Sequence, residues 1–393
     1  MRSATLITAL SALLSVRASP FASSESTGEL SKRPSKNDLC ERNLPITRDG
    51  SELKLNGKRW TASGANVYWL GLDENVIPPA GQPFYARFNA SYPTKGRITE
   101  VMNVLNTMGA HLIRSQTLGV SVGNPLSMMP SLGGKFNFLR FRGINLDTSD
   151  NSKLDPRVME FYTNPTIVSD FKNYISHYMS HKNRYTGLTY AEDPTIAIIE
   201  TGNELGGPIF GDMNVPNSWT QEIASFVKSL APEKLVMDGT YGINTTHFAV
   251  STIDLFSDHF YPLNNTKLTA GIALVASTDR VYSAGEYDWT GLKGGDSLQS
   301  FYSIVEAQQE KPKPVISGDL FWSLFEHNVP DCTQFVNHSD GFTLQYGNPA
   351  NSAQVNGQIS TIRQHFFRML GKVVGADLPA VACPGPLHSK ATK

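Results

Sequence analysis

Two glutamates each stand at the end of a strand-like apolar run. Glu204 follows Thr195–Asn203, and Glu286 ends the run Val281–Glu286. Such runs are typical of strands that are buried on both faces, and a barrel places its chemistry at the carboxyl tips of such strands. Two carboxylates that face one cleft can cleave a glycosidic bond, because one donates a proton and the other acts as nucleophile or base. The pair therefore predicts a glycosidase.

Other polar and aromatic residues stand near the ends of neighbouring runs. Arg114 ends an earlier run, and a guanidinium beside a carboxylate lowers its pKa and fixes its position. His259 taken alone is typical of a buried structural histidine. Aromatic rings near strand ends could stack on sugars, although core packing explains any one of them. These aromatic residues are Trp69, Tyr261, Trp289 and Trp322.

Competing chemistries have weaker support. Gly119–Gly123 matches the nucleophile-elbow pattern of serine hydrolases, but Pro125 and Pro130 follow where that pattern needs a helix. The nine histidines include no His-Glu-x-x-His motif, and no glycine-rich phosphate loop follows the first strand. We therefore expect no metal and no cofactor.

Composition and the N-terminus bear on location and partners. The chain has 393 residues with a net charge of -1, which gives no reason to expect nucleic acid or an anionic membrane as partner. Residues 1–19 are typical of a secretory signal peptide, and 20–43 are typical of a flexible tail. Four Asn-x-Ser/Thr sequons, at Asn89, Asn244, Asn264 and Asn337, agree with secretion. We expect a secreted, monomeric glycoprotein.

Three cysteines permit at most one intrachain disulfide. They are Cys40, Cys332 and Cys383. Because chain termini often lie close together, the pair Cys40–Cys383 is slightly favoured, but the pairing stays open.

Strand-like and helix-like segments alternate through one domain, 44–378, with a short tail at 379–393. This alternation predicts a (β/α)8 TIM barrel. The expected strands are Trp60–Trp69, Ala110–Thr117, Thr195–Asn203, Lys234–Gly239, Ile253–Tyr261, Arg280–Glu286 and Pro314–Trp322. The expected helices are Thr94–Met108, Asn164–His181, Asn217–Leu230, Asp296–Gln309 and Gln354–Met369.

The expected strands number seven rather than eight. Between Thr117 and Asn164 there is no clear helix followed by a clear strand, although Phe136–Phe141 alternates like a strand. We therefore expect a barrel that is missing a βα unit, or is distorted, around strand 3. Either a neighbouring segment fills the gap, or a coding segment has been lost and activity is impaired.

The joint motifs resemble glycoside hydrolase family 5, and more closely its fungal, secreted endo-β-1,4-mannanase-like members. The motifs that carry this resemblance are Gly64–Asn75, Glu200–Leu205, Gly285–Trp289 and Gly318–Phe325. The resemblance implies that Glu204 is the acid/base and Glu286 the nucleophile. It also implies that Asn203, Arg114, His259, Tyr261 and Trp322 contact the sugar or orient the nucleophile.

The resemblance implies a retaining hydrolase that cleaves β-1,4-linkages in mannan-type plant cell-wall polysaccharide. Two alternatives remain open. One is a β-glucanase or other β-glycosidase of the same family, and the other is a catalytically impaired sugar-binding protein.

Overall fold

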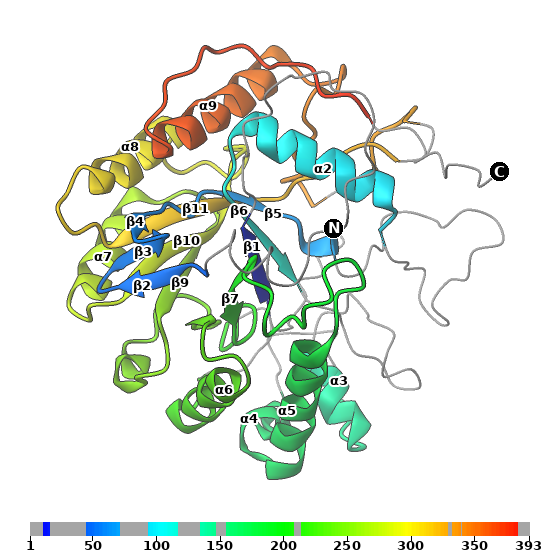
Figure 1. The fold of residues 1–393 in the computed structure, drawn as a ribbon, viewed down its shortest axis with the longest axis vertical. Coiled ribbons are helices and arrows are strands. Elements are labelled where there is room, and N and C mark those ends of the chain that lie inside the picture. Colours follow the sequence, from blue (N-terminus) through cyan, green and yellow to red (C-terminus); the bar gives the residue numbers. More distant parts are fainter. Residues whose placement is uncertain are drawn as a thin grey trace.

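The computed structural model describes residues 11–15, 45–70, 93–116, 134–146, 155–207, 214–328, 332–338 and 340–383 (Figure 1). Residues 11–15 are described by their backbone alone. Cys40 and the Gly119–Gly123 motif lie outside these residues.

Eight strands close into a barrel in the order β1-β6-β5-β11-β10-β9-β8-β7. The seven strands β5 to β11 pair in parallel with their neighbours. The barrel strands are β1 (Ser11–Ser15), β5 (Gly64–Asn66), β6 (Leu112–Gln116), β7 (Ile196–Glu200), β8 (Leu235–Met237), β9 (Leu255–Phe260), β10 (Val281–Asp288) and β11 (Ile316–Trp322). All seven predicted strands are present.

The distortion lies where the sequence places it. β1 runs antiparallel to both β6 and β7 and so occupies the position of a third parallel strand. Pairing on both sides satisfies the backbone groups that two open strand edges would expose. A segment from the start of the chain thus pairs at the place of the third strand, and the prediction of a (β/α)8-type barrel distorted around strand 3 is confirmed. β1 falls within 1–19, whose role as a signal peptide stays a prediction.

The five predicted helices form with bounds within two residues of those expected. Their first turns begin at polar caps: the side chains of Thr94, Asn164, Ser297 and Ser352 accept backbone N–H groups at four helix starts. The α-helices are α2 (Lys95–Met108), α3 (Gly134–Phe141), α4 (Glu160–Thr163), α5 (Pro165–Ser180), α6 (Asn217–Leu230), α7 (Asn265–Ala276), α8 (Leu298–Gln309) and α9 (Ala353–Met369). Short 3-10 helices cover Tyr68–Leu70, Pro156–Met159 and Thr245–Ala249.

The strand-like reading of Phe136–Phe141 is wrong, because these residues belong to helix α3. Phe138 packs edge-on against Phe171 at a centroid distance of 5.4 Å and lies 6.0 Å from Phe161. Period-2 spacing of aromatic residues over so short a segment does not distinguish a strand from one face of a helix. Contacts with α4 and α5 decide the outcome.

A small antiparallel sheet covers the end of the barrel where the strands begin. It consists of β2 (Thr47–Asp49), β3 (Glu52–Leu55) and β4 (Lys58–Arg59). Leu53 and the preceding Ile46 pack in one apolar cluster with Leu112, Leu255 and Val281, which are the first residues of their strands. The opposite end, where the strands finish, is therefore the end that can hold a site.

The described cysteines pair as Cys332–Cys383, with Cα atoms 6.0 Å apart. The slightly favoured pair Cys40–Cys383 is therefore wrong. The bridge joins the segment after β11 to the end of the domain, where the hydroxyl of Tyr346 also donates to the Pro379 carbonyl at 2.8 Å.

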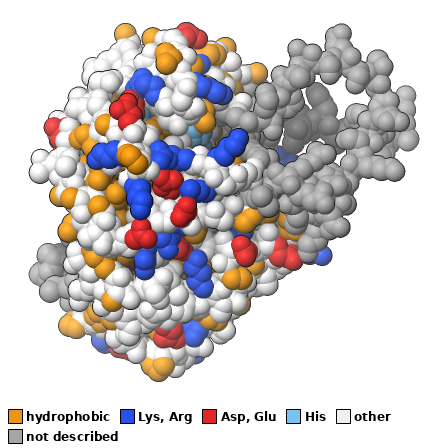
Figure 2. Space-filling model, turned by 60° about the vertical axis from the view of Figure 1, so that its left-hand side comes forward, with side chains coloured by type: hydrophobic (Ala, Val, Ile, Leu, Met, Phe, Trp, Pro, Cys, Tyr) orange, Lys and Arg blue, Asp and Glu red, His pale blue; other side chains and the backbone are white. Residues whose placement is uncertain are grey.

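The surface agrees with a net charge near zero. On the face shown in Figure 2, basic and acidic side chains are interspersed rather than separated by sign. No helix in the described part of the chain combines the length and hydropathy needed to cross a bilayer.

Candidate active site

A group of buried polar side chains meets at the carboxyl ends of the strands. Asn66 ends β5, Arg114 lies in β6, Glu200 ends β7 and Glu286 lies in β10. Each is at most 1% exposed. Because parallel strands finish at one end of a barrel, residues far apart in the sequence converge there.

Arg114 is the centre of this group. Its Nε donates to Glu200 at 2.9 Å, and its Nη1 donates to Glu286 at 2.6 Å and to Asn66 Oδ1 at 2.9 Å. Its Nη2 donates to Asn203 Oδ1 at 2.6 Å. Burial opposes the charge on Arg114, but the two carboxylates outweigh burial and raise the pKa of its guanidinium. Arg114 is therefore a permanent cation that fixes both Glu286 and Asn203.

Glu286 accepts hydrogen bonds on both carboxylate oxygens. Arg114 donates to Oε1, and the hydroxyl of Tyr261 donates to Oε2 at 2.9 Å. His259 Nδ1 lies 3.5 Å from the same Oε2. Burial raises the pKa of Glu286 above its ordinary value, although the charges of His259 and Arg114 oppose this shift. The bonds from Arg114 and Tyr261 favour the ionised form and aim the carboxylate.

Glu204 lies just beyond β7 in a different environment. Its backbone has φ = 52°, an uncommon conformation for a residue other than glycine. Its Oε1 is 2.7 Å from His259 Nδ1, and the carboxyl is 2% exposed. Burial raises the pKa of Glu204 from 4.5 to about 7, against the opposing charges of Arg114 and Lys267. Glu204 is therefore protonated up to neutral pH.

The two glutamates face each other. One carboxylate oxygen of each, together with a ring nitrogen of His259, all lie within 4.8 Å of one another. The other oxygen of Glu204 and the side-chain nitrogen of Asn203 are buried and have no hydrogen-bond partner within the described residues. Buried polar atoms without partners are costly unless a ligand satisfies them. The pair of carboxyl groups thus borders a space that a polar ligand would fill.

The same three residues are also of the types that hold metal ions. Arg114, bonded to Glu286, already supplies the compensating positive charge and would repel a cation. A second such group, Glu100, His327 and Cys383, lacks a thiolate because Cys383 is disulfide-bonded.

Of the four predicted aromatic residues, two lie at the reaction centre and two do not. Trp322, at the end of β11, is 8% exposed, stacks on Tyr68 at a centroid distance of 5.2 Å and donates from Nε1 to Asp340 at 2.7 Å. Tyr261 remains 36% exposed beside Glu286, and both rings lie where the sequence places them.

Trp69 and Trp289 do not present a ring to a ligand at the reaction centre. Trp69 is fully buried, with Arg97 over its ring at 4.3 Å and its Nε1 donating to the Leu324 carbonyl. Trp289 is 2% exposed, and its Nε1 donates to the Phe342 carbonyl at 2.6 Å. Their role in stacking on sugars stays a prediction, and the burial of both rings shows that rings near strand ends can also turn into the packing between strands and helices.

Sequence reasoning missed several members of the site. Glu200 and Asn66 complete the contacts of Arg114, and Asp340 anchors Trp322. Glu200 could have been identified from the sequence, because a charged residue within a strand buried on both faces needs a buried partner. Asp340 could not have been identified in this way, because it lies in an irregular segment. Tyr241, 47% exposed, also escaped notice, and its backbone N–H donates to the carbonyl of Leu205, next to Glu204.

Comparisons with known proteins agree with this geometry. Residues 137–281 match the family described as GH family 5 beta-mannosidase-like. A mannan endo-1,4-beta-mannosidase of Oryza sativa subsp. japonica is 31% identical over 250 residues, covering 53% of this chain and 61% of the relative. Another, of Solanum lycopersicum, is 25% identical over 228 residues, covering 49% of this chain and 51% of the relative. The chain thus spans about half the length of the curated relatives it matches.

The fold has solved counterparts. An endo-1,4-beta-mannanase from Rhizomucor miehei aligns with a TM-score of 0.55 at 18% identity, covering 84% of this chain and all of that structure. A family 5 glycoside hydrolase mannosidase of the same organism aligns with a TM-score of 0.57 at 14% identity. At these identities the likeness supports the barrel fold.

Proposed function

We propose that this protein is a retaining glycoside hydrolase of family 5 that cleaves β-1,4-mannosidic linkages in mannan-type polysaccharide. The observation that carries the proposal is the pair Glu204 and Glu286, with one carboxylate oxygen of each within 4.8 Å of the other. Retaining glycosidases hold their two carboxyl groups about 5–5.5 Å apart, and inverting enzymes hold them roughly 6.5–9.5 Å apart to admit water. The short separation favours retention.

In the first step Glu286 attacks the anomeric carbon. The bond from that carbon to the leaving oxygen breaks, and the proton of Glu204 passes to this oxygen. Glu286 is suited to attack because Arg114 and Tyr261 stabilise its ionised form. Glu204 is suited to donate because its pKa of about 7 keeps it protonated.

In the second step water attacks the same carbon and gives its proton to Glu204, while the bond to Glu286 breaks. The buried amide nitrogen of Asn203 lacks a partner within the described residues and is placed to bind a sugar hydroxyl. Arg114 holds the other end of that amide, which fixes its orientation. Trp322 supplies an aromatic face at the end of β11.

The choice of mannan rests on the comparisons, since the curated relatives in Oryza sativa and Solanum lycopersicum are named mannan endo-1,4-beta-mannosidases. Secretion rests on the signal-like residues 1–19 and on the sequons, and cleavage after residue 19 would remove β1 from the barrel. Appearance of the protein in culture medium, with N-terminal sequencing of the exported form, tests secretion.

The test of activity uses wild type, Glu204→Gln and Glu286→Gln on soluble mannan, with reducing-sugar release as readout. Both substitutions keep side-chain size and are expected to reduce hydrolysis at least a thousandfold. Gln221→Glu, a change of the same pair of residue types on α6, is the matched control. If either catalytic variant retains wild-type rates, the assignment is wrong.

Stereochemistry is tested separately. Proton NMR of the first product released from a β-mannoside should show the β-anomer before mutarotation. An α-anomer would exclude double displacement. Release of reducing sugar from β-glucan but not from mannan would replace the proposed substrate and leave the glutamate pair in place.

A further inference from the structure

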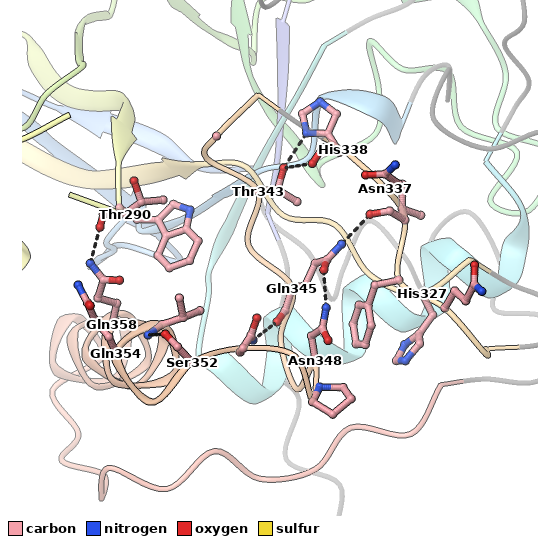
Figure 3. A pocket seen from close by; sticks show the side chains of 18 of the residues that line it. Thr290, His327, Asn337, His338, Thr343, Gln345, Asn348, Ser352, Gln354 and Gln358 are labelled. Carbon is pink, nitrogen blue, oxygen red and sulfur yellow. Dashed lines mark hydrogen bonds between the residues drawn. The ribbon is translucent and has the colours of Figure 1, made fainter. Parts of the chain in front are cut away.

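A groove of about 1140 Å³ lies outside the reaction centre, and Figure 3 shows side chains that line it. Its walls come from the residues after β10, from the segment after β11 and from the start of α9. Residues that line it include Thr290, Gln334, Asn337, Gln345, Gln354 and Gln358. None of Arg114, Glu204, Glu286 or Trp322 lines it.

The described residues that line the groove are mostly polar and include no Asp, Glu, Lys or Arg. Seven of their side chains are Asn or Gln, four are Ser or Thr, and two are the histidines His327 and His338. An amide both donates and accepts hydrogen bonds, as each sugar hydroxyl does. Without Lys or Arg the described lining has no permanent cation to pair with a phosphate or carboxylate ligand, and its two histidines lie beside Glu100 and Asp340. The groove therefore matches a neutral polyhydroxylated ligand.

Hydrogen bonds hold the floor of the groove in place. Gln345 Nε2 donates to the Val336 carbonyl at 2.6 Å, and Asn348 Nδ2 donates to Gln345 Oε1 at 2.6 Å. On the opposite wall, Gln358 Nε2 donates to the Thr290 carbonyl at 2.7 Å, which ties α9 to the residues after β10. Side chains held in this way lose little conformational entropy when a ligand binds.

One segment separates the groove from the reaction centre. Gly341 and Thr343 line the groove. Phe342, which lies between these two residues in the sequence, has its ring 5.0 Å from the ring of Tyr261. Asp340, which precedes Gly341, accepts a hydrogen bond from Trp322 Nε1. Segment 340–343 thus has the groove on one side, and on the other it contacts Tyr261 and Trp322.

We propose that this groove is an accessory binding site for a neutral oligosaccharide stretch of the same polysaccharide that the reaction centre cleaves. The inference rests on the proposed function. In this role the groove retains long chains, so it should change the affinity for the polymer and leave the rate of the chemical step unchanged.

The test removes two exposed amides of the lining, in the double variant Gln334→Ala/Gln354→Ala. Gln299→Ala is the matched control, because Gln299 is an exposed glutamine on α8 and lies outside the groove. The proteins are produced in a host that does not glycosylate, because Asn337 lies in a sequon and lines the groove.

The first readout is binding without cleavage. In a Glu286→Gln background, affinity electrophoresis in soluble mannan measures retention, with dextran as a neutral polymer of different linkage. The double variant is expected to bind mannan about five- to tenfold more weakly, as expected for loss of one or two hydrogen bonds. Gln299→Ala is expected to bind like its parent.

The second readout is kinetic, in the active protein. KM for mannan should rise by a similar factor, while kcat on mannan and both constants on mannotriose should stay unchanged. Equal mannan affinity in the double variant and the control would overturn the accessory site. Binding that is retained without any hydrolysis would instead refute the proposed function and leave the groove assignment standing.

Discussion

The raised pKa of Glu204 makes a quantitative prediction about pH dependence. With a pKa of about 7, Glu204 is about nine-tenths protonated at pH 6 and about one-tenth protonated at pH 8. If Glu204 is the proton donor, kcat/KM on a mannan oligosaccharide should fall about tenfold between these values. At the ordinary pKa of 4.5, only about 3% would be protonated at pH 6, and kcat/KM would fall about a hundredfold between pH 6 and pH 8.

The assay is a profile of kcat/KM against pH from 4 to 9, on mannohexaose and on a dinitrophenyl β-mannoside. The activated leaving group needs no proton, so kcat/KM on the dinitrophenyl substrate should not fall at high pH. On mannohexaose, kcat/KM should still fall with a midpoint near pH 7. In Glu204→Gln, activity on the dinitrophenyl substrate should persist and be flat above pH 6. A basic limb near pH 5, or one that survives in Glu204→Gln with the activated substrate, would refute the role of burial at Glu204.

The same burial has a consequence for stability. The folded-state pKa of Glu204 is raised, so its contribution to stability is fully present below pH 4.5 and is lost as the pH rises through about 7. The difference between 4.5 and about 7 corresponds to about 3 kcal/mol of unfolding free energy. Glutamine at this position cannot ionise and can still accept a bond from His259. Urea unfolding at pH 8.5 should therefore show Glu204→Gln to be more stable than wild type.

Three further perturbations test the surroundings of the site. Asp340→Ala should lower kcat/KM about 10- to 150-fold, the effect of losing a hydrogen bond to a charged group, because Trp322 loses its anchor. Asp340→Asn keeps an acceptor and should retain most activity; equal losses in the two variants would contradict the anchoring role. Asp319 and Glu306 outweigh burial and raise the pKa of His365, so its contribution to stability is present below pH 6.5 and lost as the pH rises through the folded value; urea titrations from pH 6 to 9 should therefore show a flatter stability profile for His365→Gln than for wild type, and parallel profiles would rule this out. The bridge Cys332–Cys383 spans 51 residues, and its replacement by two serines should cost roughly 2–4 kcal/mol of unfolding free energy, seen as a lower Tm by calorimetry; an unchanged Tm would show that the bridge does not constrain the unfolded chain.

The fold could be predicted well because its signals are local. Continuous apolar runs predicted the seven parallel strands, and helix-like spacing of apolar residues predicted five helices. Helix α7 was missed because Asn265–Ala276 is apolar on most of its circumference and lacks a clear amphipathic pattern. Phe136–Phe141 was assigned to the wrong element because its pattern is too short to set a period.

The candidate site could likewise be predicted only in part. Glu204, Glu286 and Arg114 could be named because a charged residue at the end of a buried strand is rare and needs a reason. The structure brings those three together, but the hydrogen bonds that give them different protonation behaviour join β5, β6, β7 and β10, far apart in the sequence. No spacing along the chain reports such contacts.

The sequence by itself determined which residue types stand at the strand ends, and hence that two carboxyl groups and a guanidinium would meet at one end of a barrel. Only the tertiary structure decided that Glu204 is buried enough to stay protonated, that Trp69 turns into the core while Trp322 stays at the rim, and that β1 fills the third-strand position. The physical reason is that strand periodicity fixes burial along one segment. Desolvation, hydrogen-bond partners and the direction of a ring depend on segments packed around it.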